Sequence, residues 1–415
     1  MRFLILVVIS AALSQTSIAR QTCAVTSTQP QSANASGSSR TLRVVLYPFI
    51  PGFASFKSAV KARFEASHPD IQLEIVDLSD NYYGPFAAQY IGCADADVYE
   101  LDSVFLYDFA VNKKIQELPP GVALSDATLL KNAVTGSMAN GKRYGAPHWV
   151  CGNFLFFNSS DTKLLNVKQL TELLRTIGQT PAANQGLAVD LMGKSTLGEF
   201  YLNVAFDRYG DLEQARQHIA LYDATIKDDL LAVSKMCLVE GCRKPDYHQT
   251  PFFAEEFAEK RARALVGYSE SLSGALAAAA DQTKCPSADK CLKDSDFAVE
   301  EFPLDDKGTH AISWVDSFAL DKKCKDQCVK DAATFIDFMT QDDTYLLALL
   351  PKGGLPTYLL PAKAALYSNA QLLRAAHLYP RLKTIIEQAA VPSALSLNEQ
   401  LRNVGRQLDS DLPQQ

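Results

Sequence analysis

The chain has 415 residues, more than a single hydrophobic core usually organises, so two domains are expected. Hydrophobic residues make up 47% of it and charged residues 21%, which is typical of a globular protein. The net charge of −7 argues against a nucleic-acid partner, because nucleic-acid-binding proteins usually carry a basic surface.

The first residues have the features of a secretion signal. Arg2 precedes an apolar run over residues 3–13 that is too short to span a membrane, and residues 17–19 (Ser-Ile-Ala) resemble a cleavage site. We therefore predict a signal peptide over residues 1–19 and a disordered leader over residues 20–40. The protein is expected to be secreted or periplasmic, with no membrane partner.

Strands and helices are predicted to alternate from residue 42 onward. A buried strand over residues 42–47 is followed by an amphipathic helix over 53–67 and a second strand over 71–76, which predicts a parallel β-α-β unit. A polar, aromatic loop over residues 77–86 contains Tyr82. Further helices are predicted over residues 104–112, 122–138, 164–177, 200–208, 223–236, 254–263, 330–340 and 343–350, and further strands over 97–101, 186–192, 264–267, 297–302 and 311–320.

A run over residues 144–157 predicts a strand and turn that cross from one lobe to another, and residues 311–320 return the chain. This layout predicts an α/β protein with the two-lobe, type 2 fold of periplasmic binding proteins and a hinged central cleft. The first lobe is expected to comprise residues 41–148 plus 313–345. The second is expected to comprise residues 149–312 plus 346–410.

Nine cysteines in an exported chain indicate disulfides. Three close pairs lie in polar, turn-like sequence, and two distant cysteines are left over, with Cys151 alone in an apolar setting. A zinc site is the weaker alternative, because no cysteine or histidine cluster has ligand spacing. The predicted pairs are Cys237 with Cys242, Cys285 with Cys291, Cys324 with Cys328, and Cys23 with Cys93.

Strand ends and crossings direct five candidate side chains to the cleft: Tyr47, Asp102, Cys151, Glu270 and Asp316. Apart from Cys151, each of these residues has a structural alternative, such as packing, helix capping or ion pairing. A thiol with a pKa of about 8.5 is only a few per cent ionised at neutral pH, so a nucleophilic cysteine needs a base.

A carboxylate whose pKa is raised in an apolar cleft could serve as that base. His148 is the alternative, but a strand offset of three places it on the face opposite Cys151, so Glu270 ranks above it.

Several stretches of the sequence resemble thiaminase I (thiamine pyridinylase), a secreted enzyme family with the two-lobe fold of periplasmic binding proteins. The stretches occur in the family's order and fall within residues 41–390. They are Leu-Tyr-Pro-Phe-Ile-Pro (46–51), Leu-Asp-Ser-Val-Phe-Leu (101–106), Tyr-Gly-Ala-Pro (144–147), Cys-Gly-Asn-Phe-Leu-Phe-Phe (151–157), Val-Gly-Tyr-Ser-Glu-Ser (266–271), Asp-Ser (316–317) and Pro-Thr-Tyr-Leu-Leu-Pro-Ala (356–362).

The resemblance implies a transferase that needs no cofactor or metal. Cys151 matches the nucleophile and Glu270 the base that activates it. The remaining matches hold the aminopyrimidine of thiamine. They are Tyr47, Asp102, Tyr268 and Asp316, to which we add Tyr82 and Trp314, the latter standing where a tyrosine is expected.

In the reaction that the resemblance implies, the thiolate adds to the pyrimidine, the thiazole leaves, and an amine or thiol acceptor takes its place. The partners are then thiamine and this acceptor, and the protein is expected to be a monomer. The alternative is a non-catalytic thiamine- or pyrimidine-binding protein of a transporter, since fold alone does not decide function. A thiol hydrolase on the same scaffold ranks lower, because neither a histidine partner nor an oxyanion hole is evident.

Overall fold

The computed structural model describes residues 39–78, 82–84, 87–287, 289–308 and 311–413. The predicted signal peptide, nearly all of the predicted leader, Cys23 and part of the loop over residues 77–86 lie outside this range, so the predictions on them stay predictions. The described residues belong to one compact unit. None of the helices among them is long and apolar enough to cross a membrane.

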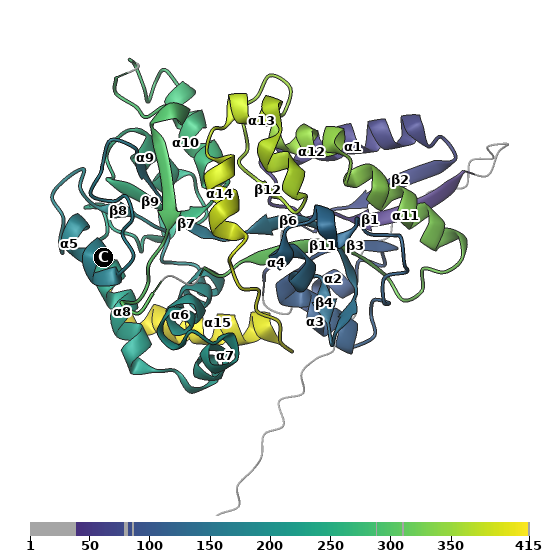
Figure 1. The fold of residues 1–415 in the computed structure, drawn as a ribbon, viewed down its shortest axis with the longest axis horizontal. Coiled ribbons are helices and arrows are strands. Elements are labelled where there is room, and N and C mark those ends of the chain that lie inside the picture. The colour runs from purple at the N-terminus through teal and green to yellow at the C-terminus, as the bar shows by residue number, and fades with distance from the viewer. Residues whose placement is uncertain (1–38, 79–81, 85–86, 288, 309–310, 414–415) are drawn as a thin grey trace, which may run out of the picture. The chain divides into compact units, whose positions relative to one another are not determined.

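Two sheets organise the unit, with a six-stranded sheet in the order β12-β6-β11-β3-β1-β2 and a four-stranded sheet in the order β10-β7-β9-β8. Figure 1 shows β7, β8 and β9 on one side and β1, β2 and β3 on the other, with β6 and β11 between them. The larger sheet comprises β1 (Arg40–Val45), β2 (Ile71–Val76), β3 (Val98–Asp102), β6 (Gly145–Cys151), β11 (Trp314–Leu320) and β12 (Leu360–Pro361). The smaller comprises β7 (Asn153–Asn158), β8 (Leu187–Ala188), β9 (Ala264–Tyr268) and β10 (Phe297–Glu301), and a separate hairpin comprises β4 (Met138–Ala139) and β5 (Lys142–Arg143).

The predicted β-α-β unit is confirmed. Strands β1 and β2 pair in parallel, and α1 (Phe53–Ser67) connects them with the predicted bounds. Its apolar residues at helical spacing, Phe56, Val60 and Phe64, are all buried. The ring of Phe64 packs edge-on against that of Phe335 at 5.5 Å, which joins α1 to the helix that follows β11.

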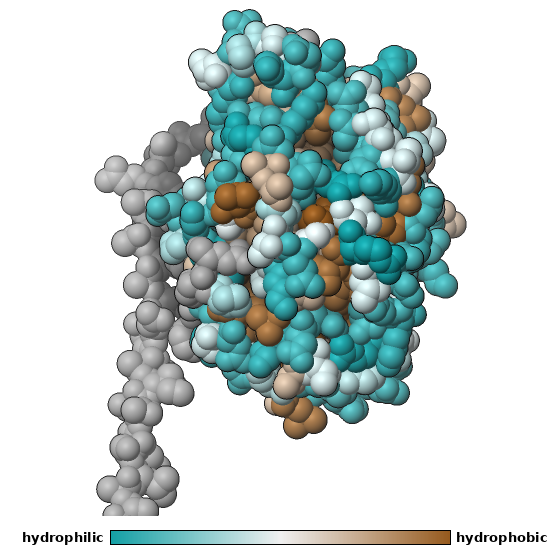
Figure 2. Space-filling view, turned by 90° about the vertical axis from the view of Figure 1, so that its left-hand side faces the viewer, coloured by the Kyte–Doolittle hydropathy of each residue, from teal (hydrophilic) through white to brown (hydrophobic). Residues whose placement is uncertain are grey.

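Helices pack around both sheets. Those of the first half are α2 (Ala87–Gly92), α3 (Ser103–Val111), α4 (Lys131–Gly136), α5 (Leu170–Ile177), α6 (Lys194–Tyr209) and α7 (Leu212–Leu221). Those of the second half are α8 (Ala224–Lys235), α9 (Phe252–Ala258), α10 (Ser271–Ala280), α11 (Gln327–Met339), α12 (Asp342–Leu349), α13 (Ala370–Ala375), α14 (Tyr379–Ile386) and α15 (Leu397–Asp411). Figure 2 shows that the face on the side of the smaller sheet is mainly hydrophilic, with hydrophobic residues in several small patches.

Three sequence predictions of long elements were wrong. The predicted helix over residues 122–138 is α-helical only at α4, because Leu129 and Leu130 instead pair with the chain at residues 362–363. The predicted helix over 164–177 begins only at Leu170, since Asn166 has a φ of 62°, which no helix accommodates. The predicted strand over 186–192 ends at Ala188.

That strand ends early because Asp190 Oδ1 accepts a hydrogen bond from the Met192 N–H at 2.9 Å, which forms a turn.

The crossing between the sheets has the predicted form. Strand β6 ends at Cys151, and β7 begins at Asn153 in the other sheet, with Gly152 between them. A side chain at Gly152 would meet the carbonyl oxygen of Ile312 at 2.9 Å, so the two crossing segments approach each other closely here.

Three of the four predicted disulfides are present, with Cα–Cα distances of 5.7 Å for Cys237–Cys242, 5.9 Å for Cys285–Cys291 and 5.2 Å for Cys324–Cys328. Cys151 is the free cysteine of the described residues. The pairing of Cys23 with Cys93 stays a prediction.

The contact between α6 and α15 gives a first testable prediction. A β-carbon at Gly198 would lie 2.2 Å from the backbone oxygen of Leu401, so Gly198→Ala must push the two helices apart. We expect a loss of unfolding free energy of about 1–3 kcal/mol, which is typical of overpacking, measured by urea denaturation. Gly274→Ala in α10 is the matched control, because its β-carbon would meet only the Ala254 side chain, at 3.3 Å. An equal effect of both substitutions would contradict the close packing.

Candidate active site

Four of the predicted site residues lie on one face of the larger sheet. Strand β11 lies between β3 and β6 and is antiparallel to both. Trp314 is directly opposite Cys151, and Asp316 is directly opposite Asp102. Opposed residues of an antiparallel pair share a face, and so do residues two apart on one strand. The register therefore gathers Cys151, Trp314, Asp316 and Asp102 on the same side.

Asp102 caps a helix and also belongs to the site. It ends β3 and precedes α3, where its Oδ1 accepts a hydrogen bond from the Val104 N–H at 2.8 Å. Its other carboxylate oxygen accepts a hydrogen bond from the Tyr83 hydroxyl at 2.5 Å. Burial raises the pKa of Asp102, against the lowering effect of these hydrogen bonds. The capping and binding interpretations of this residue are thus compatible.

Asp316 is the most unusual of the acids. It is 1% exposed, and its Oδ1 has no hydrogen-bond partner among the described residues. Burial raises its pKa well above the ordinary value, and the nearby charges of Asp102, Glu100 and Glu270 raise it further. Two neighbouring carboxyl groups that hold one proton offer one donor and several acceptors, which suits the mixed ring-nitrogen and amino edge of an aminopyrimidine.

Aromatic rings line the approach to these acids. The Tyr47 ring meets the Tyr82 ring edge-on at 6.1 Å and the Phe49 ring at 5.6 Å. Tyr82 is fully buried, and its hydroxyl donates to the Glu100 carbonyl at 2.9 Å and accepts from the Asp102 N–H at 3.1 Å. Tyr83, which the sequence analysis did not select, is the tyrosine whose hydroxyl reaches the Asp102 side chain.

The thiol of Cys151 lies in an acidic environment. Cys151 is partly buried at the end of β6, and burial raises its pKa well above the ordinary value. The charges of Asp316, Asp102, Glu270 and Glu199 raise that pKa further. The unliganded protein therefore holds a neutral thiol, and attack by sulfur would require a base that takes its proton.

Glu270 has the properties that such a base needs. It precedes α10, and its side chain makes no capping hydrogen bond to the helix. Burial raises its pKa to about 7, against the lowering effect of a hydrogen bond from its own backbone. Its charge acts on Tyr47 and Asp316 as well as on Cys151. A carboxyl group with a pKa near neutrality can both accept and return a proton.

The second sheet contributes Tyr268, which leads to a residue that the sequence analysis missed. Tyr268 is directly opposite Asn153, and its hydroxyl donates a hydrogen bond to Glu199 of α6. Trp314 makes a second side-chain hydrogen bond to Glu199, and burial raises the pKa of Glu199 to about 8. In the sequence Glu199 resembles any acid on a helix, so no local signal distinguishes it. Tyr268 and Trp314 thus meet at Glu199.

His148 lies in the core, where its Nδ1 pairs with Glu100 Oε1 at 2.5 Å. Its ring packs beside those of Trp149 and Phe318, with centroids 4.3 and 4.8 Å away. Strand alternation does not give the direction of the His148 side chain reliably, because the pairing register of β6 with β11 shifts between Asp316 and Ser317.

The burial of Asp316 predicts how stability depends on pH. Because its folded pKa is raised, the ordinary unfolded carboxyl releases its proton first, so this residue lowers stability as pH rises above about 4. Asp316→Asn should have little effect near pH 4 and should stabilise the protein at pH 7. The gain should exceed about 1 kcal/mol, since one pKa unit corresponds to roughly 1.4 kcal/mol.

Urea denaturation between pH 4 and pH 8 measures this difference, with Asp228→Asn, an exposed substitution, as the control. A pH-independent effect of Asp316→Asn would contradict the raised pKa.

Comparisons with known proteins show which proteins this chain is similar to. The Thiaminase-1 domain model matches residues 152–285. Thiaminase-1 of Paenibacillus thiaminolyticus is 27% identical over 363 residues, which cover 84% of this chain and 81% of that protein.

Solved structures extend the likeness to the fold. Thiaminase I from Bacillus thiaminolyticus has a TM-score of 0.75 at 24% identity, covering 89% of this chain and 99% of that one. Clostridium botulinum thiaminase I in complex with thiamin has a TM-score of 0.74 at 21% identity, covering 90% and 100%. The maltose-bound MalE3 protein of T. maritima also superposes, with a TM-score of 0.61 at 14% identity and coverage of 90% and 100%. The chain thus resembles thiaminase I in sequence and has the two-lobe α/β fold of periplasmic binding proteins, as the sequence predicts.

Proposed function

We propose that this protein is an exported thiamine-degrading transferase of the thiaminase I type, with Cys151 as nucleophile and Glu270 as base. One observation carries the proposal: a free thiol shares a sheet face with Asp102 and Asp316, within the field of a carboxyl group whose pKa is about 7. The thiaminase I relatives support the substrate, since one of them is described in complex with thiamin.

The proposed first half-reaction proceeds as follows. Asp102 and Asp316 hold the aminopyrimidine, with Tyr47, Tyr82, Tyr268 and Trp314 around it. Glu270 takes the thiol proton as the Cys151 sulfur bonds to a carbon of the electron-poor pyrimidine ring. The bond from the bridging methylene to the thiazolium nitrogen then breaks, and its electron pair leaves with the neutral thiazole.

The second half-reaction restores the enzyme. An amine or thiol bonds to the methylene carbon and gives up its proton, the carbon–sulfur bond to the ring breaks, and the electron pair returns to Cys151. This sequence needs no electron carrier, because no atom undergoes net oxidation. The cluster of acids also suits the permanent positive charge of thiamine.

The remaining parts of the proposal rest on the sequence. Residues 1–19 support export, and the acidic charge supports the absence of a nucleic-acid partner. We expect a monomer. The alternative function is delivery of thiamine or a related pyrimidine to a transporter, which the shared fold permits but which has no use for an activated thiol.

Product analysis separates these functions. The purified protein is incubated with thiamine and aniline, and small molecules are identified by mass spectrometry. The proposal predicts free thiazole together with a pyrimidinylmethyl-aniline adduct. Tight binding of thiamine without loss of thiamine would favour the transport function, and pyrimidine alcohol as the sole pyrimidine product would indicate a hydrolase.

Removal of the nucleophile should separate binding from turnover. Cys151→Ser keeps the size of the side chain but lacks a readily ionised thiol, so we expect thiamine to bind while turnover falls below detection. Calorimetry measures binding and product formation measures turnover. Turnover above about one-tenth of the wild-type rate would be incompatible with sulfur as the nucleophile.

Removal of the base should slow the reaction without abolishing it. Glu270→Gln keeps the shape of the side chain but takes up no proton, so kcat should fall by about 10²–10⁴-fold. In the wild type, the rate should fall as pH drops through about 7, because protonated Glu270 is not a base. Glu387→Gln, an exposed substitution, is the control for charge removal. A near-normal rate of Glu270→Gln would exclude the assigned role.

A further inference from the structure

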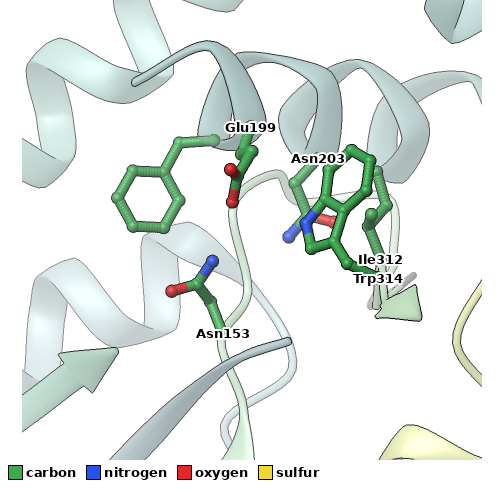
Figure 3. A pocket seen from close by; sticks show the side chains of 6 residues that line it. Asn153, Glu199, Asn203, Ile312 and Trp314 are labelled. Carbon is green, nitrogen blue, oxygen red and sulfur yellow. The ribbon is translucent and has the colours of Figure 1, made fainter. Parts of the chain in front are cut away.

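A small hollow beside Glu199 has no part in the first half-reaction. It has a volume of about 10 Å³, roughly what one water molecule or one amino group needs. The residues that surround the hollow come from α6, from the start of β7, from β11 and from the chain just before β11. They are Asn153, Glu199, Phe200, Asn203, Ile312 and Trp314. Figure 3 shows the side chains of Glu199 and Asn153 pointing toward one another across it, with Trp314 and Asn203 to one side.

The hollow presents hydrogen-bond acceptors. One carboxylate oxygen of Glu199 accepts the hydrogen bond from the Tyr268 hydroxyl, and Trp314 makes a further side-chain hydrogen bond to this carboxylate. A carboxylate has about four acceptor positions, so it can accept more hydrogen bonds than these two. The Oδ1 atom of Asn203 is buried and has no hydrogen-bond partner among the described residues. Figure 3 shows the amide nitrogens of Asn153 and Asn203 on the side of Glu199, so the free acceptor positions on this side are those of Glu199. A group that donates an N–H bond complements them.

The hollow also adjoins the nucleophile. Trp314 is the direct neighbour of Cys151 across the sheet, and Asn153 follows Cys151 by two residues. The charge of Glu199 also raises the pKa of the Cys151 thiol. The hollow therefore lies beside the residue that pairs with Cys151 and the residue two positions after it.

We propose that this hollow receives the nitrogen of the second substrate, an amine, and that Glu199 takes the proton that the amine loses. This inference rests on the proposed transferase function and names the acceptor class that the function leaves open. The amine nitrogen bonds to the bridging methylene carbon as an N–H proton passes to Glu199. The carbon–sulfur bond breaks, its electron pair returns to Cys151, and Glu199 releases the proton to solvent in the next cycle.

The chemistry of the hollow favours an amine over a thiol. An S–H group is a weak hydrogen-bond donor and satisfies Asn203 and Glu199 poorly, whereas an amine has N–H groups for both. Burial raises the pKa of Glu199 to about 8, so this group is mainly the proton-accepting carboxylate only above that pH. Water could also fit the hollow, and it would give the pyrimidine alcohol instead.

Two acceptors, of which only one must lose an N–H proton, test this role of Glu199. Aniline must lose an N–H proton when it attacks, whereas pyridine has none and forms a stable pyridinium product. Glu199→Gln should therefore lower the ratio of aniline turnover to pyridine turnover by about 10²–10⁴-fold. Glu213→Gln, an exposed glutamate on the neighbouring helix α7, is the matched control and should leave this ratio at the wild-type value.

An equal loss with both acceptors, or no loss with either, would overturn the role of Glu199. So would a shift of the wild-type products from the aniline adduct to the pyrimidine alcohol. The release of one equivalent of thiazole without any acceptor is measured separately, and its absence from the wild type would instead overturn the transferase function itself.

A second variant tests the proposal even if Glu199→Gln does not fold. Asn203→Leu keeps the number and branching of the side-chain heavy atoms but lacks the amide oxygen, so it should raise the KM for aniline about tenfold or more, consistent with one lost hydrogen bond. The KM for pyridine, which donates no N–H bond, should rise less than that for aniline. Equal KM changes for the two acceptors would contradict recognition through N–H groups.

Discussion

The pairing of β11 between β3 and β6 is the constraint on which the site depends. This strand returns from the far end of the sequence and sets Trp314 beside Cys151 and Asp316 beside Asp102. Cys151, which we propose as nucleophile, and the two acids that we propose to bind the pyrimidine thus come from three strands that are distant in sequence but joined by backbone hydrogen bonds. A one-residue change of register would turn these side chains to the opposite face and separate them. The β-bulge beyond Asp316 lies next to this segment, where bulges commonly occur near active sites.

The second constraint is electrostatic. The charges of Asp102, Asp316, Glu199 and Glu270 all act on one thiol, and burial raises the pKa of each acid. Bringing so many acids together opposes folding at neutral pH, because buried like charges repel and lose hydration. A cationic substrate relieves this repulsion, so the same arrangement that weakens the empty protein favours thiamine in the site. Acids with pKa values near neutrality can also exchange protons at small cost.

Sequence patterns predicted the elements that depend on local periodicity. The amphipathic helix α1, the β-α-β unit and the crossing at Cys151 were correct, and short spacing correctly predicted three disulfides. Elements whose form depends on distant partners were not predicted. Residues 129–130 look helical but pair with residues 362–363, and a turn at Asp190 cuts the predicted strand short.

The same distinction holds for the site. Residues at strand ends, such as Cys151 and Asp102, could be selected because strand ends converge. Glu199 and Tyr83 could not, because their importance arises from hydrogen bonds to Tyr268 and Asp102 that only the folded chain brings about. The role of every site residue in the reaction remains a proposal, whereas their arrangement follows from the fold.

The central claim is that Cys151 carries the pyrimidine during the reaction. Mass spectrometry of the intact protein after mixing with thiamine and no acceptor tests it most directly. The account predicts a mass increase equal to one pyrimidinylmethyl group, located by peptide mapping on the peptide that contains Cys151. Release of thiazole with no mass increase at any mixing time, or an adduct on a different residue, would contradict it.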